Sequence, residues 1–379
     1  MLFKTKFIPL AIALAFAGSA GAQEVIKIGH VAPVSGPSAH LGKDNENGAK
    51  MAVEELNAKG IKIGGKPVKF VLVLEDDGGD PKQGTAVAQK LVDAKVNGVI
   101  GHLNSGTTIP ASKIYFDAGI PEISPATTQT KYTQQGFNSA FRVVANDAKL
   151  GGTLGAYAVN KMGVKKIAVI DDRTSYGQGV AEEFVKGAKK AMPGVQIVGK
   201  EFTTDKATDF NAILTTIKAK NPDVIFFGGM DSVGGPLLRQ MKALGIKAKY
   251  MGGDGLCTES LPKLAGEAAV PVVTCAEAGG VPPELQKNMD DFHARYKKKY
   301  NMDVQLYAPY VYDSVMTMAA AMQQANSAEP AKYLPVLQKI KYQGVTGLIE
   351  FDAKGDIKDG SLTLYNYNNG TKTITSVIK

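Results

Sequence analysis

The chain has 379 residues, of which 44% are hydrophobic and 21% charged, and its formal net charge is +8. Its one dense basic run, Lys297–Lys299, falls in a predicted helix, so a solvated helix face explains it better than a nucleic-acid-binding patch. The histidines are scattered singly and form no cluster of ligands, so we expect no metal site and no cofactor; they are His30, His40, His102 and His293.

The first 22 residues are typical of an export signal. Lys4 and Lys6 precede an apolar run from Phe7 to Phe16, and the small residues Ala20-Gly21-Ala22 match a cleavage site. The run is about half as long as the roughly 20 residues that a transmembrane helix requires, which disfavours a retained anchor. We expect cleavage after Ala22, a periplasmic mature chain of 379 − 22 = 357 residues, and no stable membrane insertion.

A mature chain of this length exceeds what one hydrophobic core usually organises, so two lobes are expected. Strands and helices alternate in the first part, which predicts a parallel sheet covered on both faces. The predicted strands are 25–31, 68–74, 99–103, 120–124 and 140–144, and the predicted helices are 41–58, 81–92 and one that starts near Thr107.

The alternation then begins again and predicts a second α/β unit of similar size. Asp147 is expected to cap the first helix of this unit. The predicted strands are 166–170, 195–202, 223–227 and 248–251, and the predicted helices are 147–161, 176–192, 207–220 and 235–244. A Gly- and Pro-rich stretch at 276–283, three further helices at 284–299, 307–324 and 331–341, and a strand at 362–367 complete the chain.

Two predicted strands of the first unit end in small polar turns, at 104–108 and 125–128. A helix that starts near Thr107 would hold Pro110 in its first turn, where a missing N–H costs nothing. Hydroxyls and free N–H groups at the positive end of a helix suit a small anion such as a carboxylate. Ligands of parallel sheets bind outside the carboxyl ends of the strands, where both turns lie. An ordinary helix cap without a ligand is the alternative.

The chain contains two cysteines, Cys257 and Cys275. In an oxidising compartment such a pair favours a disulfide over a metal site. Closing the loop of 18 residues between them would stabilise the fold by roughly 3 kcal/mol on the chain-entropy model.

Several motifs together resemble those of the periplasmic leucine/isoleucine/valine-binding proteins of ABC transporters. The resemblance covers nearly the whole mature chain and rests on the order and spacing of Ser35-Gly-Pro37, Asp80-Pro-Lys-Gln83, Gly101-His-Leu-Asn-Ser105 with Pro110-Ala-Ser112, Ser175-Tyr-Gly-Gln-Gly179 and Phe351-Asp-Ala-Lys-Gly-Asp356.

The resemblance implies the type I periplasmic binding protein fold: an α/β chain with two Rossmann-like lobes of parallel sheet, joined by three hinge crossovers. It places the crossovers near 143–146, 275–279 and 355–362. The first lobe would comprise residues 23–145 and 278–357, and the second 146–277 and 358–379. A ligand would bind in the cleft between the lobes.

The resemblance also implies the ligand contacts. Ser105 and Thr128 would bind the α-carboxylate of an amino acid, whereas the Ala126 carbonyl, the Thr128 hydroxyl and the Asp254 carboxylate would bind its α-ammonium group. Thr127 belongs to the same turn as Thr128, and Tyr176 would approach from the second lobe. As alternatives, Asp254 is an ordinary turn residue and Tyr176 an exposed residue at the start of its helix.

The chain departs from the family pattern around the side chain of the ligand. Leu41 stands where the family prototype has an aromatic residue, Met230 stands where it has tyrosine, and Gly79 and Asn104 occupy the positions of its disulfide. The head-group site is thus retained, while the side-chain pocket, to which we assign Leu41, Asn104 and Met230, is altered. Leucine, isoleucine or valine is the expected ligand, with another neutral amino acid as the alternative. For Met230, ordinary packing in the core explains the residue equally well.

We therefore expect a monomeric periplasmic substrate-binding protein, not an enzyme, that delivers a neutral amino acid to the permease subunits of an ABC importer. A periplasmic sensor of an amino acid or amide is one alternative. A secreted α/β hydrolase is another, although the chain has neither a Gly-x-Ser-x-Gly elbow nor a phosphate loop. His102, three residues before Ser105, is predicted to pack in the core rather than to act as a catalytic base.

Overall fold

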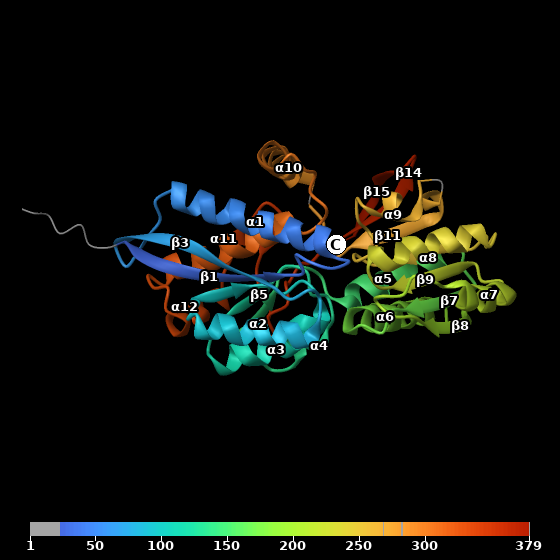
Figure 1. Cartoon of the computed structure of the whole chain (residues 1–379), viewed down its shortest axis with the longest axis horizontal. Coiled ribbons are helices and arrows are strands. Elements are labelled where there is room, and N and C mark those ends of the chain that lie inside the picture. The colour runs from blue at the N-terminus through green and yellow to red at the C-terminus, as the bar shows by residue number, and fades with distance from the viewer. Residues whose placement is uncertain (1–22, 268, 282, 379) are drawn as a thin grey trace, which may run out of the picture.

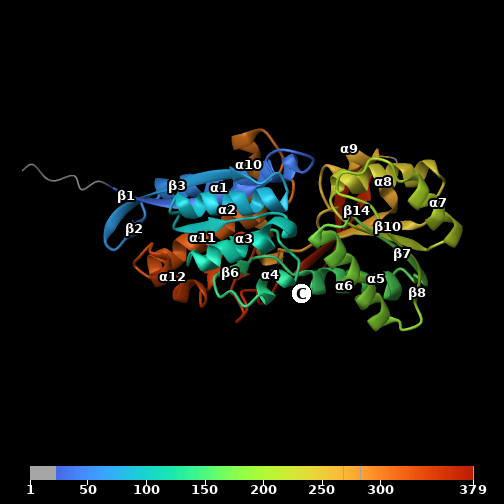
Figure 2. The same cartoon turned by 60° about the horizontal axis from the view of Figure 1, so that its bottom comes forward.

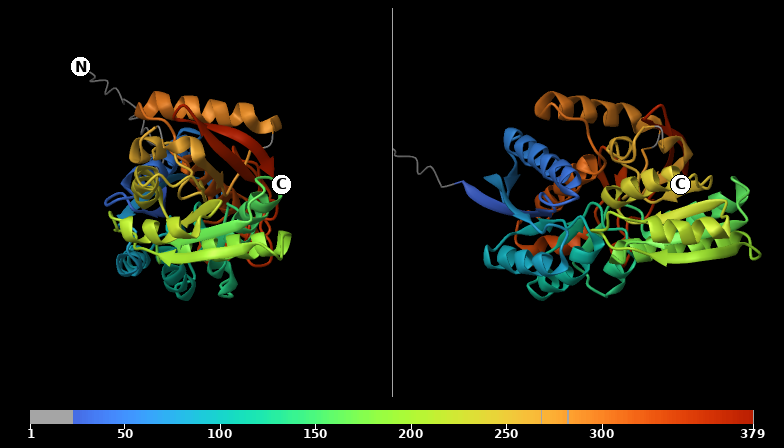
Figure 3. Two further views of the ribbon diagram at one scale, coloured as in Figure 1. Left: turned by 90° about the vertical axis from the view of Figure 1, so that its right-hand side faces the viewer. Right: turned by 45° about the vertical axis from the view of Figure 1, so that its right-hand side comes forward.

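The computed structural model describes residues 23–267, 269–281 and 283–378, so the expected signal segment lies outside the described residues. Two sheets form two lobes that lie side by side (Figure 1). The same two-lobed arrangement is seen from other directions in Figure 2 and in the right-hand view of Figure 3. The predicted α/β class with two parallel-rich sheets is confirmed.

The first lobe is built on a sheet of six strands in the order β2-β3-β1-β4-β5-β6, parallel except for β2. Helices α1 and α11, far apart in sequence, pack together on one face, and α2 and α3 cover the other (Figure 1). The strands are β1 (Glu24–Ala32), β2 (Lys62–Ile63), β3 (Lys66–Asp76), β4 (Gly98–Ile100), β5 (Glu122–Ser124) and β6 (Ala140–Arg142). The helices are α1 (Ala39–Ala58), α2 (Pro81–Asp93), α3 (Ser105–Asp117), α4 (Lys131–Gln134), α10 (Gln286–Tyr300), α11 (Ala308–Gln324) and α12 (Pro330–Leu337).

The second lobe is built on a sheet of seven strands in the order β15-β14-β11-β10-β9-β7-β8, in which β14 and β15 run antiparallel to their neighbours. The strands are β7 (Lys166–Asp171), β8 (Gln196–Phe202), β9 (Val224–Gly228), β10 (Lys249–Gly252), β11 (Val273–Glu277), β14 (Leu362–Asn368) and β15 (Thr371–Ile378). The helices are α5 (Asp147–Asn160), α6 (Ser175–Ala191), α7 (Asn211–Lys220), α8 (Asp231–Ala243) and α9 (Leu261–Ala265). A short ladder of β12 (Tyr342–Gln343) and β13 (Leu348–Ile349) stands apart from both sheets.

Alternation along the strands explains why helices cover both faces of each sheet. In β9, Val224 and Phe226 join one apolar core, and Phe226 stacks on Phe184 of α6 with ring centroids 4.0 Å apart. Ile225 and Phe227 point the other way, into the core formed with α7 and α8. Because side chains alternate with a period of two, an unbroken apolar strand must be buried on both sides.

Three differences from the sequence prediction concern the site and the disulfide. Helix α3 begins at Ser105 rather than near Thr107, so Pro110 lies inside the helix and removes the bond to the carbonyl of Gly106. The cap of α5 is Asn146, whose side chain accepts from the N–H of Lys149, and Asp147 is the first helical residue. Cys275, expected at the edge of a crossover, belongs to strand β11, which was not predicted.

The predicted disulfide between Cys257 and Cys275 is present, with the two Cα atoms 5.4 Å apart. It ties the turn after β10 to the neighbouring strand β11. Among the helices that the structure describes, none has the length and apolar content needed to cross a bilayer.

Candidate functional site

The loops at the carboxyl ends of five parallel strands meet between the lobes. From the first lobe come the loop after β4, which leads into α3, and the turn after β5. From the second lobe come the starts of α6 and α8 and the turn after β10. Such crevices are where parallel sheets bind ligands, because helix N-termini and open turns converge there.

Asp254 provides a buried carboxylate in this crevice. Its Oδ2 accepts a hydrogen bond of 2.9 Å from the hydroxyl of Tyr307, whereas Oδ1 is buried without a partner. Burial raises the pKa of Asp254 to about 6, and the hydroxyls of Tyr176 and Tyr307 offset part of that rise. A carboxylate with one free oxygen in a dry site is suited to bind a cation.

The turn that carries Asp254 is held from several sides. The backbone carbonyl of Asp254 accepts from the N–H of Cys257 at 3.0 Å. The N–H of Gly255, the next residue, donates to the Tyr176 hydroxyl at 3.0 Å. The carbonyl of Gly255 in turn accepts from the N–H of Asp231 at 2.7 Å. Tyr176 is therefore a buried residue of the crevice rather than an exposed residue at the start of α6.

Across the crevice lies the N-terminus of α3. The carbonyl of Asn104 accepts from the N–H groups of Thr107 and Thr108 at 3.0 Å and from both of their hydroxyls at 2.9 Å. Ser105 follows as the first helical residue and is buried, and its hydroxyl accepts from the N–H of Gln129 at 3.4 Å. The first N–H groups of a helix lack intrahelical acceptors, so this end can bind an anion.

The turn after β5 packs against this helix end. The Thr127 hydroxyl lies 2.5 Å from that of Thr108, so it fastens the turn to α3. The Thr128 hydroxyl is buried near the Asp147 carboxyl and has no close hydrogen-bond partner among the described residues, and the Thr128 carbonyl accepts from the N–H of Asp147 at 2.7 Å. Of these two threonines, Thr128 therefore has the hydroxyl that is free to bind a ligand.

Asp147 is a buried acid that the sequence reasoning treated only as a helix cap. Within the part of the chain that the structure describes, neither of its carboxyl oxygens has a close hydrogen-bond partner. Burial raises its pKa well above the ordinary range, the Thr128 hydroxyl opposes this rise, and the nearby Asp254 adds to it. Because the amide of Asn146 already provides the cap, the acidic residue directly after it was the available signal.

Tyr307 is a further residue that the sequence did not single out, although it binds Asp254 directly. It precedes α11, and the backbone there is held by Asp44 of α1. The buried Asp44 carboxylate accepts from four successive N–H groups, those of residues 305–308, at 2.8–3.1 Å. This clamp fixes the helix end from which Tyr307 reaches the second lobe.

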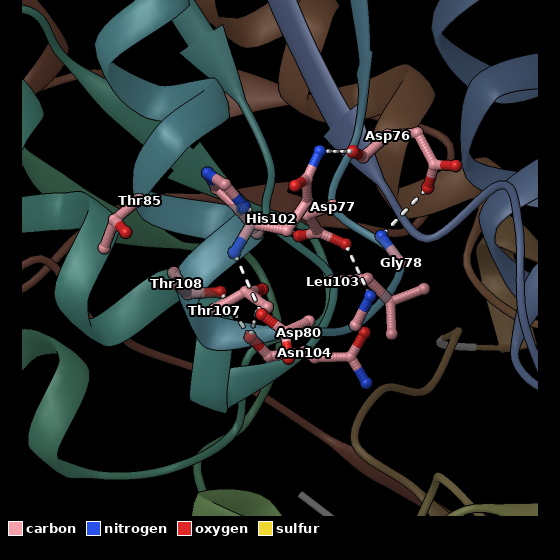
Figure 4. A network of polar contacts seen from close by, with 12 residues as sticks. Asp76, Asp77, Gly78, Asp80, Thr85, His102, Leu103, Asn104, Thr107 and Thr108 are labelled. Atoms are coloured by element: carbon pink, nitrogen blue, oxygen red, sulfur yellow. Dashed lines mark hydrogen bonds and ion pairs between the residues drawn. The ribbon is translucent and has the colours of Figure 1, made fainter.

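His102 is buried below the site, as predicted. One ring nitrogen lies 2.8 Å from an oxygen of Asp77 (Figure 4). The other lies 3.0 Å from the Tyr115 hydroxyl. Both nitrogens are thus engaged, which leaves neither free to act on Ser105.

Two cavities lie between the lobes. The inner one, of about 10 Å³, is lined by six of the predicted residues, namely Asn104, Ser105, Ala126, Tyr176, Met230 and Asp254, together with Leu103 and Tyr307. The outer one, of about 370 Å³, shares Asn104, Ser105, Tyr176 and Met230 with it. Neither lining includes Thr127, Thr128 or Leu41, and Leu41 is fully buried in the core of the first lobe.

Comparison with known proteins places the chain among binding proteins. A sequence model described as "Periplasmic binding protein" matches residues 25–372. The chain is 36% identical over 375 residues to the Leu/Ile/Val-binding protein homolog 1 of Brucella abortus (97% of both chains), and 33% identical over 370 residues to a leucine-, isoleucine-, valine-, threonine- and alanine-binding protein of Pseudomonas aeruginosa (97% of this chain, 96% of the other). The crystal structure of the LivJ substrate-binding protein of Streptococcus pneumoniae with isoleucine superposes with a TM-score of 0.83 at 29% identity, covering 94% of this chain and 99% of the other.

Proposed function

The chain belongs to the periplasmic binding protein family, and we propose that it binds the zwitterionic head group of a neutral amino acid between its two lobes. The observation that carries this proposal is the pairing of opposite chemistries in one crevice. Asp254 contributes a buried carboxylate with a free oxygen from the second lobe. The N-terminus of α3 contributes N–H donors from the first lobe.

The ammonium group would bind to Asp254 Oδ1, the Ala126 carbonyl and the Thr128 hydroxyl. Asp254 and Ala126 line the same small cavity, and the Thr128 hydroxyl is buried and unpartnered beside Asp147. Desolvating an ammonium group is favourable only when its donors are all paired, and these acceptors supply the pairing. Asp147 would add negative potential behind Thr128.

The carboxylate group would bind to the Ser105 hydroxyl and to N–H groups at the start of α3, with a further N–H from Thr128. The helix dipole favours a negative charge at this end. Tyr176 would close the site from the second lobe. Thr127 would act through the turn, because its hydroxyl is already bonded to Thr108.

In this proposal the protein is a carrier without catalysis of its own. It would present the bound amino acid to the permease subunits of an importer after export and cleavage behind Ala22. The lobes would span 23–145 with 278–357 and 146–277 with 358–379. The branched-chain amino acids bound by the named relatives are the first ligands to test.

Isothermal titration of the chain from Gln23 onward with the common amino acids tests the proposal. We expect a one-to-one complex with at least one neutral amino acid. The analogue of that ligand without its ammonium group, and the analogue without its carboxylate, should each bind at least a hundredfold more weakly, since either leaves buried charge unpaired. Absence of binding to any amino acid, or equal binding of the truncated analogues, would refute the head-group site.

A further inference from the structure

Asn104 stands at the junction of the two cavities. It lines the inner space with Ser105 and Asp254, and it also lines the outer space toward solvent. In the proposed complex the ligand's head group lies at the inner end, so its side chain must extend past Asn104 into the outer cavity.

The side-chain amide of Asn104 hydrogen-bonds to none of the described residues. Asn104 occupies the cap position of α3, yet its side chain makes no capping bond, and its Oδ1 is buried and unpartnered. Only the backbone carbonyl is used, by Thr107 and Thr108 (Figure 4). Gly79 lies beside the amide, and a Cβ built there would be in ordinary van der Waals contact with Oδ1, at 3.5 Å.

The outer cavity is lined by both apolar and polar groups, and its charges balance. Two acids, Asp172 and Asp205, and two bases, Arg173 and Lys206, line it. Asp172 is buried, and its Oδ2 also lacks a partner. Leu41, which was predicted to line the side-chain pocket, does not line this cavity. Its apolar lining residues include Met230, Val233 and two prolines. This balance favours an uncharged ligand side chain, and the free oxygens favour one that carries N–H donors.

We propose that the ligand's side chain bears a carboxamide, which pairs with the amide of Asn104. This inference rests on the proposed function and specifies its ligand class. A carboxamide offers one acceptor and two donors, which matches the donor and acceptor of the Asn104 amide. An aliphatic side chain at the same place would leave the buried Oδ1 unsatisfied, and sites built around a hydrogen bond discriminate strongly against analogues that lack it.

Two isosteric ligand pairs test the proposal by titration: asparagine against leucine, and glutamine against methionine. We expect the wild-type chain to bind at least one amide ligand tenfold or more tightly than its apolar counterpart. The Asn104→Leu variant, which preserves side-chain shape, should lower that preference at least tenfold. Asn160→Leu, at an exposed position at the end of α5, is the matched control and should leave it unchanged.

Tighter wild-type binding of leucine and methionine would overturn the carboxamide assignment while leaving the head-group site intact. The carboxamide assignment would also be overturned if a folded Asn104→Leu chain preferred the amide ligand over its apolar counterpart to within twofold of the wild-type preference. The wild-type comparison decides the matter even if that variant does not fold. Failure of all four ligands and every other amino acid would instead refute the proposed function and this inference together.

Discussion

Asp254 and Tyr307 come from different lobes, and their 2.9 Å hydrogen bond crosses the crevice. This bond satisfies one carboxylate oxygen and leaves the other free. The tyrosine hydroxyl therefore orients the acid without neutralising it. In the proposed binding mode, such an arrangement would make amino-acid binding depend on whether Asp254 is ionised.

We expect the affinity for the amino acid to depend on pH through Asp254. Its pKa in the free protein is raised to about 6, mainly by burial, so the carboxylate becomes protonated below that pH. Because the ammonium group requires the charged form, affinity should fall about tenfold per pH unit below 6 and be flat above it. Titrations between pH 5 and 7.5 measure this profile.

His40 provides the control, because it bridges the lobes at 2.8 Å from Asp231. Hydrogen bonding to Asp231 and the charges of Asp231 and Asp44 raise its pKa against the opposing effect of burial. Because the pKa of His40 is raised, protonated His40 stabilises the pair with Asp231 at low pH, and this stabilisation is lost as the pH rises. The pH dependence is opposite in sign to that expected from Asp254. In the His40→Gln variant, the affinity for the amino acid should fall below pH 6 at least as steeply as in the wild type. An affinity that does not change with pH in either protein would contradict the role assigned to Asp254.

At the scale of elements, Arg142 of β6 holds the turn that carries Thr127 and Thr128. The fully buried guanidinium donates to the carbonyls of Thr127 and Gln129 at 3.0 Å and to the Thr133 hydroxyl at 2.7 Å, and it pairs with Asp356. One side chain thereby shapes a whole turn of the proposed site.

Replacing Arg142 with methionine should lower the free energy of unfolding by on the order of 3 kcal/mol, because it leaves carbonyls and a carboxylate without their donor. We also expect weaker amino-acid binding. Thermal unfolding and titration measure both effects. The exposed Arg239, replaced in the same way, is the control, and equal stability of the two variants would show that Arg142 does not hold the turn.

The disulfide links the Asp254 turn to strand β11. Replacing both cysteines with serine should cost roughly 3 kcal/mol of stability on the chain-entropy model. Chemical denaturation of the double variant, compared with the oxidised wild type, measures the loss. Equal midpoints and slopes for the two proteins would contradict a stabilising role.

Periodicity and turn chemistry predicted most helices and strands, because long amphipathic and apolar segments signal their own structure. Strand β11 was missed because Pro271 and the Gly- and Pro-rich stretch after Cys275 resemble a linker, although tertiary pairing with β10 and β14 makes it a central strand. Strand β15 was also missed, and the Asn369-Gly370 pair at its start, with both residues at positive φ, was a readable hairpin signal.

The candidate site was predictable only in part. The polar turns at strand ends indicated Ser105 and its neighbours, and the family resemblance supplied Asp254. Tyr307 was missed, and Asp147 was taken only as a helix cap, because the group near both of them, Asp254, lies far away in sequence. Tyr307 meets Asp254, 53 residues earlier, only through lobe contact. Such pairings follow from the arrangement of whole lobes rather than from any local pattern.

At the scale of the whole molecule, the lobes touch through several side chains around the crevice. Besides Tyr307–Asp254 and His40–Asp231, the Ser260 hydroxyl donates to Gln305 at 2.8 Å. The inner cavity of about 10 Å³ has room for roughly one water molecule. In the proposed binding mode, an amino acid would therefore enter only when the lobes move apart, and closure around it would replace the Tyr307–Asp254 contact with contacts to the ligand.

In the proposed binding mode, a buried ammonium group meets Asp254 between the lobes. Titration of the Asp254→Asn variant with the best wild-type ligand tests this directly, because the change removes the charge while nearly preserving the shape. We predict a loss of about 3–5 kcal/mol of binding free energy, or more than a hundredfold in Kd, with the chain still folded. Wild-type affinity in that variant would contradict the proposed binding mode.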